Sequence, residues 1–204
     1  MGTPSHTSYT ADEALARLQA GNDRFFRGEA RFPTVQKEIL AGLASGQRPF
    51  ATILGCSDSR VPPELIFDAG FGDLFIVRVA GNVNSPEVMG TFQYAVMYLR
   101  TPLFVVLGHE GCGAIDAALA VKHHDATVPA RIAVLLQCIL PGLDALPSGL
   151  SPDDEKRAAV EANVRWSMHQ ILATPEAKAR VAEGVMKLIG AVYELQSGRV
   201  RFLP

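Results

Sequence analysis

The sequence predicts an α/β fold with a mostly parallel sheet flanked by helices. Two apolar runs, residues 51–55 (A-T-I-L-G) and 103–108 (L-F-V-V-L-G), are short and end in glycine, which is the pattern of buried parallel strands. Runs of this kind alternate along the chain with helical stretches, as in βαβ units. The chain has 204 residues, of which 48% are hydrophobic, so one domain can bury a sizeable core. We therefore expect residues 1–204 to form a single domain.

The first half of the chain supplies most of the predicted sheet. A helix is expected over residues 11–20, because Thr10 can cap its start and Gly21 can close its end. The elements that follow are a helix at about 35–43, a strand at 51–55, a short helix around 62–64, a strand at 74–79, a helix at about 86–100, a strand at 103–108 and a helix after Cys112.

The second half is mainly helical before the chain returns to the sheet. In order, we expect an apolar helical stretch at 132–140, a loop at 141–152, a helix that starts at Ser151 with acidic residues in its first turn and runs to about Leu172, a helix at 175–188, and a hairpin within 190–203 that turns at Gln196-Ser197-Gly198.

Composition excludes several classes of partner. The net charge is −2, the pI is about 6.2, and there is no basic cluster, so nucleic acid and anionic membranes are poor candidates. The first residues lack the basic region and apolar core of a signal peptide, and no apolar run approaches the ~18 residues that span a bilayer. Three cysteines fit a reducing compartment. We expect a cytoplasmic protein.

Three residues that bind zinc well follow two of the predicted strands. Cys56 comes directly after the strand at 51–55, and His109 and Cys112 come directly after the strand at 103–108. These side chains can converge if the two strands are neighbours, roughly 4.8 Å apart, because parallel strands end at a common edge of the sheet. Two thiols and an imidazole are one ligand short of a tetrahedral site. Such a set is typical of a catalytic rather than a structural zinc.

Each of these residues alone has a simpler interpretation. A lone buried cysteine is usually a small hydrophobic residue, and a lone histidine after a strand is usually a hydrogen-bonded polar group. Cys138 illustrates the simpler case: it lies in the apolar stretch at 132–140 with no metal-binding neighbour, and we interpret it as a core thiol. It is the combination at two strand ends that favours a metal site.

The two motifs resemble those of the beta-class carbonic anhydrases. C-S-D-S-R at 56–60 and H-E-G-C-G at 109–113 carry the resemblance, with R-V-A-G-N at 78–82 between them, and it extends over about residues 11–203. The resemblance implies a four-stranded parallel core plus a fifth C-terminal strand, with helices on both sides. It also implies an N-terminal helical arm, residues 1–30, that clasps a second subunit.

The resemblance further implies roles for individual residues. Cys56, His109 and Cys112 match the ligands of one Zn²⁺ per subunit, and Asp58 and Arg60 match the paired acid and base beside the metal. Gln47 matches the amide that binds substrate oxygen, and Gly113 matches the residue whose backbone faces the zinc-bound oxygen. Phe75 and Tyr94 match apolar walls of the CO2 pocket. Alone, Gln47 would be read as a solvated loop residue, and Phe75 and Tyr94 as ordinary core aromatics.

The implied reaction is the reversible hydration of CO2 to bicarbonate and a proton by zinc-bound hydroxide. Zinc acidifies its bound water, but two thiolates cancel its formal charge, so help from neighbouring residues is needed. Asp58 can accept a hydrogen bond from the hydroxide, and Arg60 can keep Asp58 ionised and off the metal. If that pair breaks, Asp58 can become the fourth ligand, and the resemblance implies such a closed form at lower pH.

Two other functions are consistent with the same residues. Some members of the resembled family hydrolyse carbonyl sulfide or carbon disulfide. Alternatively, the zinc could be structural in a binding protein, although a closed site normally needs a fourth cysteine or histidine, and none lies near either motif. Some members also have a bicarbonate regulatory site with a tryptophan three residues before the first cysteine. Ile53 stands there, so we expect no such inhibition.

The N-terminal segment predicts a dimer or a multiple of dimers. Leu15 and Leu18 give the helix at 11–20 only a thin apolar stripe, which we expect to be too small to hold the helix on its own sheet. The alternative is that it folds back on its own subunit. If the resemblance holds, deletion of residues 1–28 should leave a monomer or an aggregate with little activity.

Overall fold

A computed structural model of the chain describes residues 7–32, 37–124 and 126–204. The helices are α1 (Ala11–Phe26), α2 (Lys37–Leu43), α3 (Pro63–Ile66), α4 (Pro86–Tyr94), α5 (Gly113–His124), α6 (Ala130–Gln137), α7 (Pro152–Leu172) and α8 (Pro175–Ala182), with shorter helical turns η1 (Ala80–Asn82), η2 (Ala95–Leu99) and η3 (Leu140–Leu143). The strands are β1 (Ala51–Gly55), β2 (Leu74–Arg78), β3 (Leu103–His109), β4 (Lys187–Tyr193) and β5 (Val200–Phe202).

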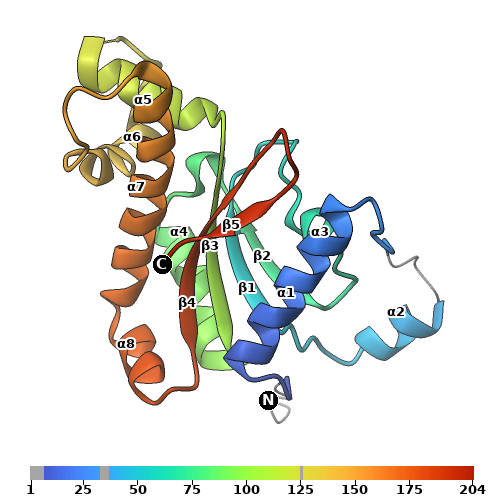
Figure 1. The fold of residues 1–204 in the computed structure, drawn as a ribbon. Helices are drawn as coiled ribbons and strands as arrows, with labels where there is room; N and C mark the ends of the chain where they lie inside the picture. The colour runs from blue at the N-terminus through green and yellow to red at the C-terminus, as the bar shows by residue number, and fades with distance from the viewer. Residues whose placement is uncertain (1–6, 33–36, 125) are drawn as a thin grey trace.

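The strands form one five-stranded sheet in the order β2-β1-β3-β4-β5 (Figure 1). The first four strands are parallel, and β5 returns antiparallel to β4. This confirms the predicted α/β class and the parallel core with a fifth C-terminal strand. It also confirms that β1 and β3 are neighbours, with Gly55 opposite Leu107. The carboxyl ends of β1 and β3 therefore lie side by side.

Helices cover both faces of the sheet, because the buried strands present apolar side chains alternately to each side (Figure 1). On one face, Leu103, Val105 and Leu107 of β3 pack with α1 and α3. On the other face, Phe104 and Val106 pack with α4, α5 and α7. All seven residues of β3 are buried, as the continuous apolar run predicts.

Glycines in β3 and β4 let α7 lie close to the sheet. A Cβ added at Gly108 would meet Val164 Cγ2 at 2.7 Å, and one added at Gly190 would meet Val164 Cγ1 at 2.9 Å. Val164 is fully buried. Since a larger residue at either strand position would push the helix away, these two glycines set the distance between α7 and the carboxyl end of the sheet.

The N-terminal helix packs on the sheet of its own chain. Ala14 and Leu18 are fully buried in the cluster that contains the α1-facing side of β3. Asn22 adds polar contacts: its Nδ2 donates to the carbonyl oxygens of Ile66 and Gly198, and its Oδ1 accepts from the N–H of Val200. The expectation that the apolar stripe is too small for its own sheet is therefore wrong. A role of residues 1–30 in dimerisation stays a prediction.

Two predicted helix ends are wrong, and glycine conformation explains both. We expected the first helix to end at Gly21, but α1 continues to Phe26. Gly21 is needed for a close contact inside the helix, because a Cβ added there would meet the carbonyl oxygen of Phe67 at 1.9 Å. The left-handed residue that follows the helix is instead Gly28, with φ 71°. Similarly, we expected a helix over 175–188, but α8 ends at Ala182 before Gly184, whose φ is 71°. The chain then enters β4, which begins earlier than the hairpin pattern predicted.

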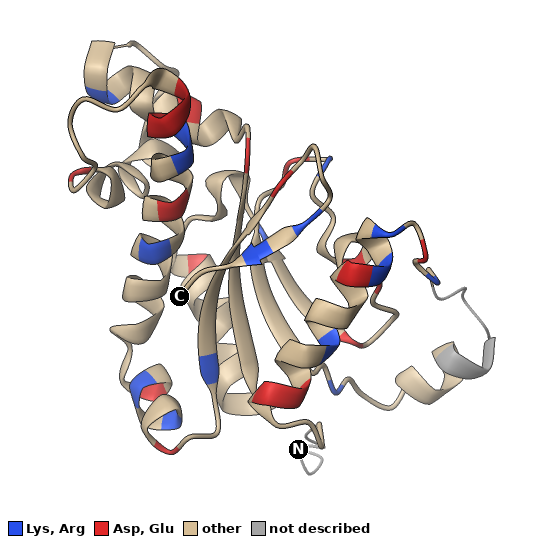
Figure 2. Cartoon of the chain, viewed as in Figure 1, with Lys and Arg blue, Asp and Glu red and all other residues tan. Residues whose placement is uncertain are grey.

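Other elements agree with the sequence within a few residues. The expected helix at 86–100 appears as α4 followed by the wider turn η2, and Arg100 ends it in the left-handed conformation with φ 51°. The helix expected at 35–43 appears as α2, and residues 33–36 lie outside the described part of the chain. Charged residues lie mainly on the helices and connections, and the parallel strands carry few (Figure 2). Among the described residues, no helix is both long and apolar enough to cross a membrane.

Candidate metal centre

The structure brings Cys56, His109 and Cys112 together at the carboxyl end of the sheet. Cys56 follows β1, His109 is the last residue of β3, and Cys112 precedes α5. One ligand atom from each residue lies within 4.8 Å of the others. All three side chains are buried, with exposed fractions of 4%, 0% and 3%. Neighbouring parallel strands thus produce the convergence that the spacing predicts.

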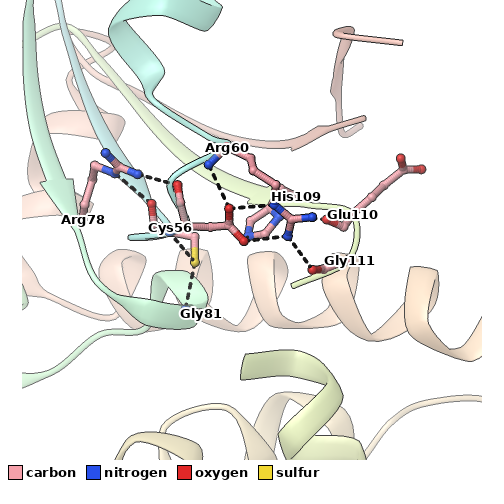
Figure 3. A network of polar contacts seen from close by, with 8 residues as sticks. Cys56, Arg60, Arg78, Gly81, His109, Glu110 and Gly111 are labelled. Carbon is pink, nitrogen blue, oxygen red and sulfur yellow. Dashed lines mark hydrogen bonds and ion pairs between the residues drawn. The ribbon is translucent and has the colours of Figure 1, made fainter. Parts of the chain in front are cut away.

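The hydrogen bonds of His109 leave one ring nitrogen available for a metal. Its Nδ1 lies 2.8 Å from the carbonyl oxygen of Glu110 (Figure 3). A carbonyl can only accept, so Nδ1 carries the proton and Nε2 carries a lone pair. Nε2 is buried and, among the described residues, has no hydrogen-bond partner. A buried imidazole nitrogen without a partner, beside two thiols, is the donor set that zinc prefers.

The two cysteines share a proton when no metal is bound. A hydrogen bond from the Cys112 thiol, helped by the nearby backbone N–H groups, lowers the pKa of Cys56 against the effect of burial. The same hydrogen bond, together with burial, raises the pKa of Cys112. The pair therefore holds one proton between its two sulfurs, and metal binding has to displace that proton.

Backbone groups from two turns surround the sulfur of Cys56 (Figure 3). The N–H of Gly81 donates to Sγ at 3.3 Å, and the N–H of Asp58 donates at 3.4 Å. Arg78, the last residue of β2, ties down the same segment: its Nε donates to the carbonyl oxygen of Cys56 at 2.8 Å and its Nη2 to that of Asp58 at 2.6 Å. The ligand turn is thus fixed from the neighbouring strand.

Asp58 lies beside the metal-binding nitrogen and is held by Arg60. Oδ2 of Asp58 is 4.0 Å from Nε2 of His109. The guanidinium of Arg60 donates to both carboxylate oxygens, and the backbone N–H of Arg60 also donates to Oδ1. The hydrogen bonds from Arg60 outweigh partial burial and hold the pKa of Asp58 well below its usual range. Asp58 is therefore ionised, and Arg60 holds its carboxylate beside the three ligands.

Of the remaining predicted site residues, Gly113 lies next to the three ligands, and the other three lie apart from them within one chain. Gly113, the first residue of α5, is adjacent and exposed. Phe75 is opposite Thr52, four residues before Cys56, which corresponds to roughly 13 Å along the strand. The ring of Tyr94 lies beside that of Phe75 in a tilted arrangement, with ring centroids 6.1 Å apart. Gln47 is exposed and precedes the opposite end of β1.

Sequence reasoning assigned no role to Arg78, Gly81 or Gly111. The first two contact the Cys56 turn, and the carbonyl oxygen of Gly111 accepts from Nη2 of Arg60 at 3.1 Å. Arg78 and Gly81 belong to the segment R-V-A-G-N, which was part of the resemblance. Their hydrogen bonds could not be foreseen, because they depend on the register of β2 against β1.

Comparison with known proteins agrees with this geometry. The family described as carbonic anhydrase matches residues 51–200 of the chain. Carbonic anhydrase 2 of Mycobacterium tuberculosis is 42% identical over 189 residues, which cover 91% of this chain and 89% of that protein. The carbonic anhydrase of Mycolicibacterium smegmatis is 38% identical over 188 residues, covering 92% and 90%. The beta-carbonic anhydrase CcaA has a similar structure, with a TM-score of 0.75 at 26% identity and coverage of 93% and 91%. The chain therefore belongs to the beta-class carbonic anhydrases, enzymes whose general reaction is the hydration of CO2.

Proposed function

We propose that this protein holds one Zn²⁺ per subunit through Cys56, His109 and Cys112 and uses it for the reversible hydration of CO2 to bicarbonate and a proton. The observation that carries the proposal is the buried Nε2 of His109, which has no partner among the described residues and lies within 4.8 Å of two thiols. A zinc ion held there supplies a Lewis acid that makes water a nucleophile near neutral pH.

Three ligands favour a catalytic rather than a structural zinc. Among the described residues, the only group of three or more metal-binding side chains within reach of one another consists of these three. A structural zinc site is usually closed by four protein ligands. The nearest candidate for a fourth ligand is the carboxylate of Asp58, and both of its oxygens are bonded to Arg60.

We infer that Asp58 orients the attacking water rather than storing its proton. Its carboxylate lies beside Nε2 of His109 and can accept a hydrogen bond from water at the metal-facing side. Because its pKa is far below neutrality, the carboxylate binds a proton poorly at the pH where the enzyme works. The remaining lone pair of the water is then directed toward CO2, and the proton leaves to solvent.

Arg60 decides between two positions of Asp58. While the ion pair is intact, the carboxylate points to the guanidinium, as in the structure described here. If the pair opens, Oδ2 is near enough to the three ligands to become a fourth. We propose this closed form as an inactive state, which matches the low-pH form that the family resemblance implies.

The proposed CO2 pocket requires a second copy of the chain. Phe75 and Tyr94 pack together but lie about four strand residues from Cys56 of the same chain, and Gln47 is at the other end of β1. They can line the pocket only if a second subunit presents them. The outer edge of β2, an end strand of the sheet, is next to this aromatic pair. We therefore propose a homodimer or a multiple of dimers.

We also propose a cytoplasmic location. Cys56, Cys112 and Cys138 are all free thiols, and two of them belong to the metal centre. A reducing compartment keeps such ligands available, because oxidation to a disulfide would remove them. Expression with and without an oxidising secretion route, followed by zinc analysis, tests this: zinc content should be complete only in protein made in the reducing compartment.

A stopped-flow assay on protein of known metal content tests the activity. Protein with one zinc per chain should hydrate CO2, protein stripped by a chelator should not, and added zinc should restore the rate. Carbonyl sulfide and carbon disulfide are supplied to the same preparation as competing substrates. Hydrolysis of either compound without CO2 hydration, or full CO2 hydration by the stripped protein, would contradict the proposal.

A further inference from the structure

A short left-handed loop presents a backbone N–H to the metal ligand Cys56. Gly81 and Asn82 in η1 have φ values of 70° and 43°, and the N–H of Gly81 donates to Sγ of Cys56 (Figure 3). Two consecutive residues in this region are costly, above all at the non-glycine position, so the surrounding structure must hold them there. The question is which residues do so.

Helix α7 supplies two of the contacts that hold the loop. Nδ2 of Asn163 donates to the carbonyl oxygen of Gly81 at 2.8 Å, and Oγ of Ser167, one helical turn later, donates to the carbonyl oxygen of Asn82 at 3.1 Å. Both α7 side chains have an exposed fraction of 1%. The two bonds fix the peptide unit that joins Gly81 to Asn82 and the peptide unit after it, and with them the backbone angles of Asn82. The Gly81 N–H belongs to the preceding peptide unit, which meets the fixed one at the Cα of Gly81, so the effect of Asn163 on its direction passes through the φ and ψ of Gly81.

Asn163 makes this contact at a cost to its own hydrogen bonding. Its Oδ1 is buried and has no partner among the described residues. A buried polar atom without a partner destabilises the fold, and apolar residues fill the flanking positions of the same helix, such as Val160 and Val164. Packing alone therefore does not explain why residue 163 is an asparagine. The hydrogen bond that its Nδ2 donates to the carbonyl oxygen of Gly81 does explain it.

We propose that Asn163 is a positioning residue of the metal centre, which orients the Gly81 N–H toward the sulfur of Cys56 and thereby limits how strongly that sulfur donates to the metal. The inference rests on the proposed function, because Cys56 is assigned there as a ligand. A hydrogen bond to a thiolate withdraws electron density from it, so a bound metal keeps more of its Lewis acidity. Asn163 acts through Gly81.

Substitution in α7 is a better test than substitution of the loop. A Cβ at Gly81 would meet Ile139 Cδ1 at 2.9 Å and Ala114 Cβ at 3.0 Å, and it would have to adopt a positive φ. Any variant at that position would therefore disturb packing as well as the hydrogen bond. Asn163→Ala removes the donor, whereas Val164→Ala is a matched control: the adjacent helix residue is buried to the same degree, and its truncation removes core packing but leaves the Asn163 side chain in place.

The experiment replaces zinc by cobalt(II) and records the sulfur-to-cobalt charge-transfer band. In Asn163→Ala the band should move to longer wavelength, because the sulfur is richer in electrons and gives up an electron more easily. Ser167→Ala should shift the band less in the same direction, since this substitution releases only the carbonyl oxygen of Asn82, one peptide unit further from the Gly81 N–H. Val164→Ala should leave the band in place while lowering thermal stability.

Amide hydrogen exchange gives a second measurement that needs no enzyme activity. The Gly81 amide should exchange faster in zinc-loaded Asn163→Ala than in the wild type, with the amides of β3 unchanged. An unshifted cobalt band in Asn163→Ala, or equal shifts in Asn163→Ala and Val164→Ala, would overturn the inference. If Asn163→Ala does not fold, the Ser167→Ala spectrum decides in the same way. Failure of the wild type to bind cobalt would instead reject the metal site itself.

Discussion

Arg60 holds Asp58 through both carboxylate oxygens: Nε donates to Oδ1 at 2.9 Å, and Nη2 donates to Oδ2 at 2.7 Å. The same Nη2 donates to the carbonyl oxygen of Gly111, which lies on the turn that leads to Cys112. The guanidinium therefore joins the turn after β1 to the turn after β3. Its planar fork makes this geometry specific to arginine, because a lysine offers a single point charge.

The first prediction concerns this ion pair. Asp58→Asn should keep one zinc per chain but lose CO2 hydration by about a hundredfold or more, because the attacking water is no longer oriented by an anion. Stopped-flow assay at pH 8.5, with metal analysis of the same sample, measures both. Arg60→Lys should give a smaller loss. Wild-type turnover in Asp58→Asn would show that the carboxylate has no part in the reaction.

The second prediction concerns the proposed ligands. Cys56→Ser, His109→Ala and Cys112→Ser should each lose zinc and nearly all activity, because the remaining two residues cannot hold the metal. Cys138→Ser is the matched control: this thiol is half-buried on α6's C-terminal cap and should be replaceable without loss of zinc. Stoichiometric zinc in all three ligand variants, measured by elemental analysis, would refute the assignment.

The third prediction concerns a buried carboxylate away from the metal. The Asp68 side chain is fully buried and accepts hydrogen bonds from Nε of Arg24 and from the backbone N–H groups of Arg31 and Phe32. Burial alone would raise the pKa of Asp68, but these hydrogen bonds outweigh it and lower the pKa. Asp68→Asn should reduce the free energy of unfolding by about 2 kcal/mol at pH 7.

The pH dependence of that difference has a definite sign. Since the pKa of Asp68 is lower in the folded state, its contribution is present above the unfolded value of about 3.9 and is lost as the pH falls through the folded value. Denaturant unfolding of wild type and Asp68→Asn from pH 7 to pH 3 should therefore give curves that converge only below about pH 4. A constant difference over this range would exclude the charged form as the cause.

The fourth prediction concerns the proposed dimer. Several large apolar side chains are exposed beside β2: Tyr94 (45%), Met97 (52%) and Tyr98 (60%). Tyr98→Glu should shift the protein from dimer to monomer in light scattering and reduce hydration activity, because Phe75 and Tyr94 of the second copy leave the pocket. Val134→Glu, on α6 and 64% exposed, should change neither.

A fully active monomer in either variant would reject the shared pocket. Surface substitution is sharper here than deletion of residues 1–28. Because Leu18 is fully buried in the core of its own chain, the deletion would remove core packing and any subunit contact together.

Residue patterns predicted the parts of the fold that depend on local sequence. The buried strands β1 and β3 were predicted to within one residue, since a continuous apolar run that ends in glycine has few other structures available. The three candidate ligands followed from the same strands. The predicted helix end at Gly21 was wrong, because the sequence alone does not distinguish a glycine needed for close contact with Phe67 from a glycine that ends a helix.

Contacts between distant segments could not be predicted in this way. The Asn163–Gly81 hydrogen bond joins residues 82 positions apart, and nothing near Asn163 in the sequence indicates a link to the metal centre. The separation of Phe75 and Tyr94 from Cys56 within one chain also depends on strand register. Sequence comparison can suggest that such residues act together, but only the register shows that one chain alone does not bring them together.

The hydrogen bonds of Asn22 link the first helix to residues that the ribosome adds much later. Its side chain bonds to Gly198 and Val200, which lie 176 and 178 residues later. At about 5–20 residues per second, a ribosome adds those residues roughly 10–40 s after Asn22. Until then the amide of Asn22 lacks two of its partners, and β5 is not yet available to pair with β4. The nascent chain therefore reaches its final stability only after Val200 has been added, and a product truncated before Val200 should be degraded rather than accumulate.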